Sequence, residues 1–178
     1  MKDLIENTNN ILIIGKKECG KTTVLQRFGI LHTRNESEQI PIYIDMMKLN
    51  KGKDRILVAC QNFVFNNMSS DMPITKKQIQ NMLSNGKVIC LFDNVNISKA
   101  DHLLWINNFT KLFPNNRFIF AAEEKFYQTY TLKELPDFRV KYKAVYLEYF
   151  GKRQVREMVT KWGEGKIGFD ANEMTQKI

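Results

Sequence analysis

The stretch from Gly15 to Thr22 constrains what this chain can fold into more than any other. Its sequence, Gly-Lys-Lys-Glu-Cys-Gly-Lys-Thr, has the spacing Gly-x4-Gly-Lys-Ser/Thr. Residues 10–14 before it form a short apolar run that is typical of a buried parallel strand. Residues 21–31 after it carry apolar side chains at helical spacing. Strand, glycine loop and helix in this order predict a loop that cradles phosphate groups.

Each residue type in this loop has a chemical task. Gly15 and Gly20 lack side chains, so the backbone can turn tightly and present N–H groups to phosphate oxygens. We expect Lys21 to reach the β- and γ-phosphates of a nucleotide and the Thr22 hydroxyl to be a ligand of Mg2+. The following helix directs the positive end of its dipole toward the same phosphates. The residues that we expect to bind the nucleotide are Gly15, Lys16, Lys17, Glu18, Cys19, Gly20, Lys21, Thr22 and Thr23.

A second element, residues 87–93, completes the expected site. It is an apolar run, Val-Ile-Cys-Leu-Phe, that ends at Asp93. A buried strand that delivers a carboxylate beside Mg2+ is a Walker B element. We therefore expect Thr22 and Asp93 to hold the ion, and Lys21 and Asp93 to take part in catalysis. Many strands end in aspartate, so this interpretation depends on the glycine loop upstream.

Strands and helices alternate along the chain, which predicts an α/β fold. The expected strands are 10–14, 40–45, 88–92, 117–122 and 140–147, and the expected helices are 21–31, 54–65, 75–83, 98–113 and 151–162. Thr75 and Ser98 are the expected caps of two helices, and Asn85-Gly86 the expected end of one.

These elements predict three layers, α/β/α, around a mainly parallel sheet of five strands. We expect the order 5-1-4-3-2 of the additional-strand class of P-loop NTPases. Strand 117–122 would then lie between the strand of the glycine loop and the strand that ends at Asp93. Pro41 favours an edge position for strand 40–45, because proline cannot donate a ladder hydrogen bond.

Length and composition predict a globular core over residues 1–150. Residues 151–178 are the expected start of a C-terminal helical segment that is cut short, with a further helix beginning near Asp170. No apolar run reaches membrane-spanning length and no signal peptide is evident, so we expect no membrane partner. The three cysteines lack metal-site spacing and indicate reduced thiols in a cytoplasmic protein.

The net charge of +8 is compatible with nucleic acid or with a phosphate ligand. Arg139, Lys141 and Lys143 alternate along an expected strand, and tyrosines lie between and after them. We interpret this pattern as a solvated face. A nucleic-acid surface is the alternative.

Several segments resemble one family of P-loop proteins. They are the loop 15–23, the strand Ile-Pro-Ile-Tyr-Ile-Asp at 40–45, the run 86–95, the strand 117–122 and the segment 146–155. Together they are similar to STAND-class P-loop NTPases, and within these to the NACHT-like proteins. The resemblance implies an ATP-driven, Mg2+-dependent switch in signalling or antiphage defence. It also implies a longer parent chain with effector and sensor domains, and a homo-oligomer that forms with the nucleotide state.

The chain departs from this family at two positions. NACHT proteins usually continue with Gly-x-Asp-Glu after the Walker B aspartate, whereas residues 94–97 here are Asn-Val-Asn-Ile. Asn96 can orient a water but cannot accept its proton. The arginine that usually ends the sensor strand is replaced by Glu123, with Lys125 two residues on. We therefore expect ATP binding with slow hydrolysis, and Glu123 or Glu124 is the alternative catalytic base.

Three other functions are alternatives for a chain with this glycine loop. Ser98-Lys99-Ala100-Asp101 imitates the guanine-reading motif of GTPases, but it lies too close to Asp93 to form a separate base pocket. A small-molecule kinase would need an arginine-bearing lid, which the sequence does not offer. A nucleic-acid-dependent ATPase is the third alternative and depends on the positive charge.

Overall fold

The computed structural model describes residues 10–34, 38–49, 54–67, 74–124 and 137–163. The chain divides into two compact units, residues 1–147 and residues 148–178. Lys125 and the helix expected from Asp170 lie outside the described residues. No helix among the described segments has the length and apolar character to cross a membrane.

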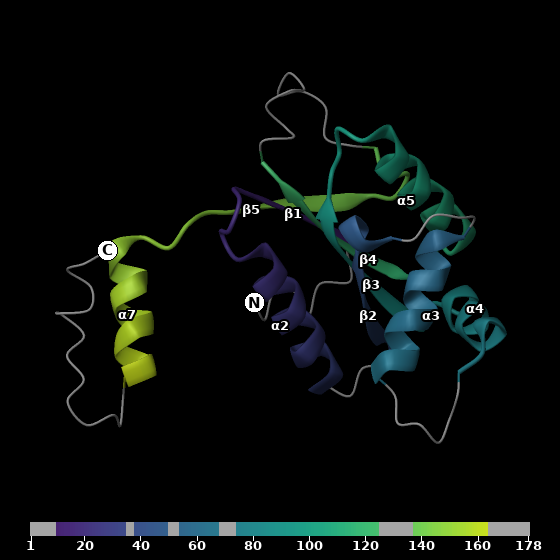
Figure 1. Ribbon diagram of the computed structural model, residues 1–178, viewed down its shortest axis with the longest axis horizontal. Coiled ribbons are helices and arrows are strands. Elements are labelled where there is room, and N and C mark those ends of the chain that lie inside the picture. The colour runs from purple at the N-terminus through teal and green to yellow at the C-terminus, as the bar shows by residue number, and fades with distance from the viewer. Residues whose placement is uncertain (1–9, 35–37, 50–53, 68–73, 125–136, 164–178) are drawn as a thin grey trace. The chain divides into compact units, whose positions relative to one another are not determined.

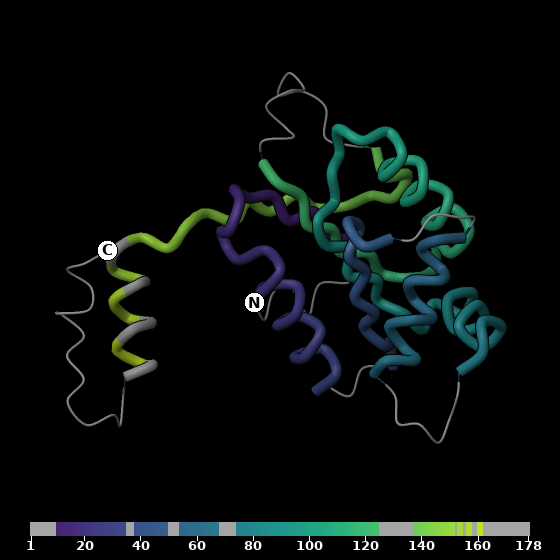
Figure 2. Tube along the Cα trace, in the orientation of Figure 1, coloured from purple at the N-terminus to yellow at the C-terminus, as the bar shows by residue number. Residues whose placement is uncertain are grey.

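The first unit contains one sheet of five parallel strands (Figure 1). These are β1 (Asn10–Gly15), β2 (Ile40–Asp45), β3 (Val88–Val95), β4 (Arg117–Glu123) and β5 (Tyr142–Leu147), in the spatial order β2-β3-β4-β1-β5. This order confirms the predicted one, and the chain path through it can be followed in Figure 2. Pro41 lies on an edge strand, as its missing N–H requires.

Helices cover both faces of the sheet and make three layers. One face packs against α2 (Lys21–Arg34) through a cluster that includes Leu25, Phe28 and Leu91. The other face packs against α3 (Arg55–Asn67), α4 (Lys76–Ser84) and α5 (Ala100–Leu112), which Figure 1 shows set apart from α2. Because both faces are covered, the central strands are apolar at successive positions rather than alternating.

Local sequence signals explain where most elements begin and end. The Thr75 hydroxyl accepts the Gln78 N–H and the Gln78 side chain accepts the Thr75 N–H, which is a capping box. Asn85 and Gly86 end α4, as predicted, with Gly86 at φ +67°. The Ser98 prediction was wrong, because α5 begins at Ala100 and Lys99 occupies the cap position without a side-chain hydrogen bond.

The second unit holds α7 (Lys152–Gly163), close to the helix expected at 151–162. The Gln154 side chain accepts a hydrogen bond from the Gly151 N–H at 2.7 Å, which satisfies one donor at the start of the helix. Arg153 and Glu157 form an exposed ion pair at 3.5 Å. Exposed pairs of this kind add little to stability.

His32 is a buried polar group near the end of α2. Its side chain is only 6% exposed, and its ring stacks on Phe28 with centroids 5.8 Å apart. Neither ring nitrogen has a hydrogen-bond partner within the described segments. Burial, with the positive charge of Arg117 as a smaller cause, lowers the pKa of His32 below its ordinary value. The ring is therefore held neutral.

We expect His32→Leu to make the first unit less sensitive to acid. The unfolded chain takes up the His32 proton at about pH 6.5, whereas the folded chain resists protonation to lower pH. Stability that is present above this pH is therefore lost as the pH falls, and leucine cannot contribute to that loss. Urea unfolding at about pH 7.5 and about pH 5.5 measures the difference for both chains. An equal loss in the two chains would contradict the assignment.

Candidate nucleotide-binding site

The loop that joins β1 to α2 has a tight backbone, with one close approach and two left-handed residues. A Cβ at Gly15 would lie 2.5 Å from the Cys19 Sγ and 2.5 Å from the Leu147 carbonyl oxygen. Gly20 has φ +97°, and Glu18 has φ 63° although it carries a side chain. A left-handed residue with a Cβ costs about 1–2 kcal/mol. Strain of this kind is typical of ligand-binding loops.

Lys21 lies across this loop. Its ammonium donates to the carbonyl oxygen of Gly15 at 2.9 Å and to that of Lys16 at 2.5 Å, and it lies 3.8 Å from the Cys19 Sγ. The cation is thus held against the loop at the start of α2. Phosphate oxygens are stronger acceptors than these neutral carbonyls, because the bond is then between two charged groups.

Asp93 and Thr22, the two residues expected to hold a magnesium ion, are in contact. The Thr22 hydroxyl donates to the Asp93 Oδ2 at 2.7 Å, which joins the start of α2 to β3. Asp93 is only 1% exposed, whereas Thr22 is exposed. The two residues are 71 positions apart in sequence. They come together because β1 and β3, on either side of β4, both end at this edge of the sheet.

Two further contacts hold Asp93, and the sequence analysis missed both. The Tyr43 hydroxyl on β2 donates to the Asp93 Oδ2 at 2.6 Å. The Asn94 N–H donates to the Asp93 Oδ1 at 2.9 Å. The alternation of β2 places Tyr43 on the α2 side of the sheet, and this was the one available signal. Its partner depends on the register of β2 against β3, which the sequence does not specify.

Tyr43 is a firm hydrogen-bond donor. Burial raises the pKa of its hydroxyl, and the hydrogen bond to Asp93 and the negative charges of Asp93 and Asp45 raise it further. The phenol therefore stays protonated throughout the physiological pH range.

The ends of β2 and β3 are also tied together. Asp45 and Asp93 are register partners, and the Asn94 amide donates to the Asp45 Oδ1 at 2.9 Å. Asn94 has φ 55°, a left-handed conformation that asparagine tolerates better than most residues. Asp45 also accepts the Met47 N–H at 3.0 Å. Asn94, which follows Asp93, thus links the end of β3 to the end of β2.

A cavity of about 580 Å³ opens beside the loop. It is lined by Lys17, Glu18, Gly20, Lys21, Thr22, Thr23, Met47, Asn94, Val95, Asn96, Lys99 and Glu123. Of the expected nucleotide-binding residues, Gly15, Lys16 and Cys19 are not in this lining and instead contact Lys21. Asp93 is also outside the lining and lies behind Thr22.

The two glutamates at the end of β4 differ in their relation to the cavity. Glu123 lines the cavity and is the register partner of Gly15. Glu124 is outside the lining, and its N–H donates to the Gly15 carbonyl oxygen at 2.9 Å. Of the two alternative bases, Glu123 is therefore the one placed at the site.

Asn96 and Lys99 also line the cavity. The His102 Nδ1 accepts the Asn96 N–H at 3.2 Å, and the Asn96 Oδ1 accepts the Ser98 N–H at 3.0 Å. Lys99 is exposed and adds a cation to the cavity. Sequence reasoning considered it only as part of a false guanine-reading motif.

The donors present fit a magnesium ion. Mg2+ takes oxygen ligands and commonly binds one or two protein groups together with phosphates and waters. The Thr22 hydroxyl and the Asp93 carboxylate supply such oxygens. Within the described segments, no cluster of three or more His, Cys, Asp and Glu side chains could hold a metal ion by itself. An ion at Thr22 would therefore need a nucleotide to complete its coordination.

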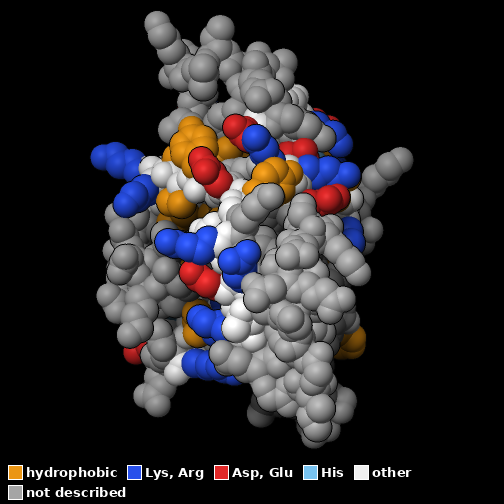
Figure 3. Space-filling model, turned by 90° about the vertical axis from the view of Figure 1, so that its left-hand side faces the viewer, with side chains coloured by type: hydrophobic (Ala, Val, Ile, Leu, Met, Phe, Trp, Pro, Cys, Tyr) orange, Lys and Arg blue, Asp and Glu red, His pale blue; other side chains and the backbone are white. Residues whose placement is uncertain are grey.

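On the face that Figure 3 shows, the described Lys and Arg side chains are interspersed with acidic and hydrophobic ones. Arg139, Lys141 and Lys143 are all exposed, which both the solvated face and its nucleic-acid alternative require.

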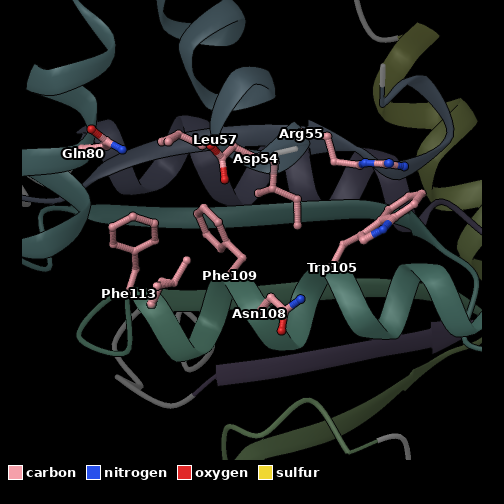
Figure 4. A pocket seen from close by; sticks show the side chains of 10 residues that line it. Asp54, Arg55, Leu57, Gln80, Trp105, Asn108, Phe109 and Phe113 are labelled. Atoms are coloured by element: carbon pink, nitrogen blue, oxygen red, sulfur yellow. The ribbon is translucent and has the colours of Figure 1, made fainter. Parts of the chain in front are cut away.

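A second cavity, of about 350 Å³, lies between α3, α4 and α5. Its walls are largely apolar, and the Arg55 guanidinium lies 3.8 Å from the centroid of the Trp105 ring (Figure 4). Phe109 and Phe113 line it from α5 and the residue that follows α5. It contains no part of the glycine loop, and no pattern in the sequence predicted it.

No model of a known protein family matches the sequence, and no curated protein matches it. Solved structures do. The Aeropyrum pernix ORC2 protein in its ADP form is 11% identical, with a TM-score of 0.63 over 97% of this chain and 51% of that chain. AMPPCP-bound DnaA from Aquifex aeolicus is 16% identical, with a TM-score of 0.59 over 99% and 52%. The Aeropyrum pernix ORC1 protein in complex with DNA is 14% identical, with a TM-score of 0.55 over 89% and 44%.

The fold is that of the P-loop NTPases. At these identities the likeness concerns the fold. This P-loop chain spans about half the length of the first two proteins, 51% and 52%.

We expect Gly15→Ala to destabilise the P-loop domain. The added Cβ would meet a backbone carbonyl oxygen and a sulfur at 2.5 Å, and overpacking of this kind costs about 1–3 kcal/mol. Gly29→Ala is the control, because its Cβ would meet only the movable Leu91 Cδ1 at 3.2 Å, Pro41 lies farther off, and alanine favours the helix. Thermal unfolding compares the two variants. Equal melting temperatures would contradict the close packing at Gly15.

Proposed function

We propose that this chain is an ATP-binding switch domain that hydrolyses ATP slowly or not at all. The hydrogen bond of 2.7 Å between Thr22 and Asp93 carries the proposal, because it joins the two halves of a nucleotide–magnesium site. Lys21, held at the mouth of the same loop, supplies the cation for the β- and γ-phosphates. Two proteins of the same fold were solved with ADP or with AMPPCP.

Each residue has a role in this proposal. Backbone N–H groups of the loop and the start of α2 bind the phosphates, and Lys21 neutralises their charge. Thr22 would hold Mg2+ together with Asp93, which accepts the hydrogen bond of the Thr22 hydroxyl. The ion would neutralise negative charge on the phosphates.

The biological setting that we favour is a STAND-class, NACHT-like protein of signalling or antiphage defence. The sequence segments around the loop, β2, β3 and β4 support it. In such a setting the domain acts in the cytoplasm, between effector and sensor domains of a longer chain. It exchanges ADP for ATP and forms a homo-oligomer in one nucleotide state.

A nucleic-acid-dependent ATPase is the second candidate. The net charge of +8 and the similar fold of an ORC1 protein in complex with DNA favour it. Binding of DNA or RNA that weakens steeply with salt would support this candidate over the switch. A kinase or a GTPase is less favoured, because β4 separates β1 from β3.

We expect Lys21→Ala to abolish ATP binding, because it removes the side-chain cation aimed at the β- and γ-phosphates. Lys77→Ala is the matched control. It removes the same charge, but Lys77 is exposed on α4 and outside the cavity lining. Calorimetric titration with ATP and Mg2+ measures both affinities. Unchanged affinity in Lys21→Ala would show that the loop is not a nucleotide site.

We also expect slow turnover in the wild-type domain. Asn96 cannot accept a proton, and general-base help is worth about 10²–10⁴-fold. Single-turnover hydrolysis should be faster in Asn96→Asp and unchanged in the double variant Glu123→Gln/Glu124→Gln. Brisk wild-type turnover that the double variant loses would instead make Glu123 the base, since it alone of the two lines the cavity.

A further inference from the structure

The Asp93 carboxylate accepts three hydrogen bonds within the described residues. Its Oδ2 accepts from the hydroxyls of Thr22 at 2.7 Å and Tyr43 at 2.6 Å, and its Oδ1 accepts from the Asn94 N–H at 2.9 Å. The side chain is 1% exposed and absent from the cavity lining. Asp93 therefore acts on the cavity through residues that line it, and Thr22 is the one whose side-chain hydroxyl donates to Asp93.

The direction of the Thr22 hydroxyl follows from this arrangement. A hydroxyl has one proton and two acceptor lone pairs. Because the Thr22 proton is donated to Asp93, the lone pairs are left for a cation on the cavity side. The place of the Asp93 Oδ2 thus decides where these lone pairs point.

Tyr43 is the second hydroxyl donor to the Asp93 Oδ2. It lies on β2, whose residues pair in register with β3 through Asp45 and Asp93. The amide of Asn94 bonds Asp45 and fixes the ends of the two strands together. The ring of Tyr43 packs against the core on the α2 side, so its hydroxyl is anchored.

We propose that Tyr43 is a positioning residue that sets the magnesium affinity of Thr22 through Asp93. This inference rests on the proposed function, because it requires a nucleotide and Mg2+ at the loop. It assigns β2, an edge strand that contributes no residue to the phosphate loop, a share in metal binding.

The test compares Tyr43→Phe with Tyr142→Phe. Both changes remove one hydroxyl from a partly buried tyrosine of the same sheet, and Tyr142 lies on β5, outside the cavity lining. ATP affinity is measured by calorimetry in excess Mg2+ and again in EDTA. The dissociation constant in EDTA divided by the one in Mg2+ gives a ratio that isolates the contribution of the ion. Circular dichroism checks that each variant is folded.

We expect the ratio to fall by about 10-fold in Tyr43→Phe, as is typical when a partner of a metal ligand is removed. Affinity in EDTA and both affinities of Tyr142→Phe should match the wild type. In a Thr22→Val background, Tyr43→Phe should change nothing further, because the ligand through which it acts is gone.

Four results would overturn the inference. Unchanged affinities of folded Tyr43→Phe in both conditions would show that the hydroxyl does not act on the ion. Equal losses in Mg2+ and in EDTA would show a structural role alone. Wild-type binding without any dependence on Mg2+ would remove the ion from the site but leave nucleotide binding intact. Failure of the wild type to bind ATP in either condition would overturn the proposed function as well.

Discussion

The hydrogen bond between Thr22 and Asp93 is the contact on which the candidate site depends. It joins the first turn of α2 to the end of β3. The strand before α2 is β1, and β1 does not pair with β3 in the sheet. The bond can form only if β1 and β3 run parallel and end at the same edge, with β4 between them. The buried apolar strands that fix this order therefore also fix the chemistry at their ends.

Burial makes that contact more than a local bond. Asp93 is 1% exposed, so each donor that it lost would leave part of a carboxylate without compensation in a region that water does not reach. Thr22, Tyr43 and the Asn94 N–H share this task, and they come from α2, β2 and β3. A small change in the packing of any of these elements would thus move Asp93 and, with it, the Thr22 hydroxyl at the cavity.

Much of this could be predicted from the sequence because local signals and global packing agree. The glycine spacing, the apolar run that ends at Asp93 and the proline of β2 were sufficient for the sheet order. They also selected Thr22 and Asp93 as residues of one site, although not the hydrogen bond between them. The prediction failed where side chains choose between near neighbours. Ser98 has the chemistry of a cap, yet the turn at Asn96 uses its backbone N–H, and α5 begins two residues later.

Contacts that depend on strand register were beyond the sequence. Nothing in the order of residues says that Tyr43 reaches Asp93, because a shift of one position in the pairing of β2 with β3 would turn its side chain to the other face. The difference between Glu123 and Glu124 was also beyond the sequence, because it depends on where β4 ends. Glu123 is the last residue of β4, and Glu124 lies in the turn that follows. Lys99 reaches the cavity because of where the turn after β3 places the start of α5.

The distribution of sulfur atoms has a consequence for the chemistry of the whole chain. Cys60 and Cys90 are fully buried, whereas Cys19 is partly exposed within the loop, with its Sγ 3.8 Å from the Lys21 ammonium. An alkylating reagent added to the folded chain would therefore find one thiol out of three, and that thiol belongs to the loop itself. A bulky adduct there would meet Gly15 and Lys21 at once. The phosphate loop thus carries its own chemical handle, through which a fluorophore or a blocking group could be placed at the site without any engineered residue.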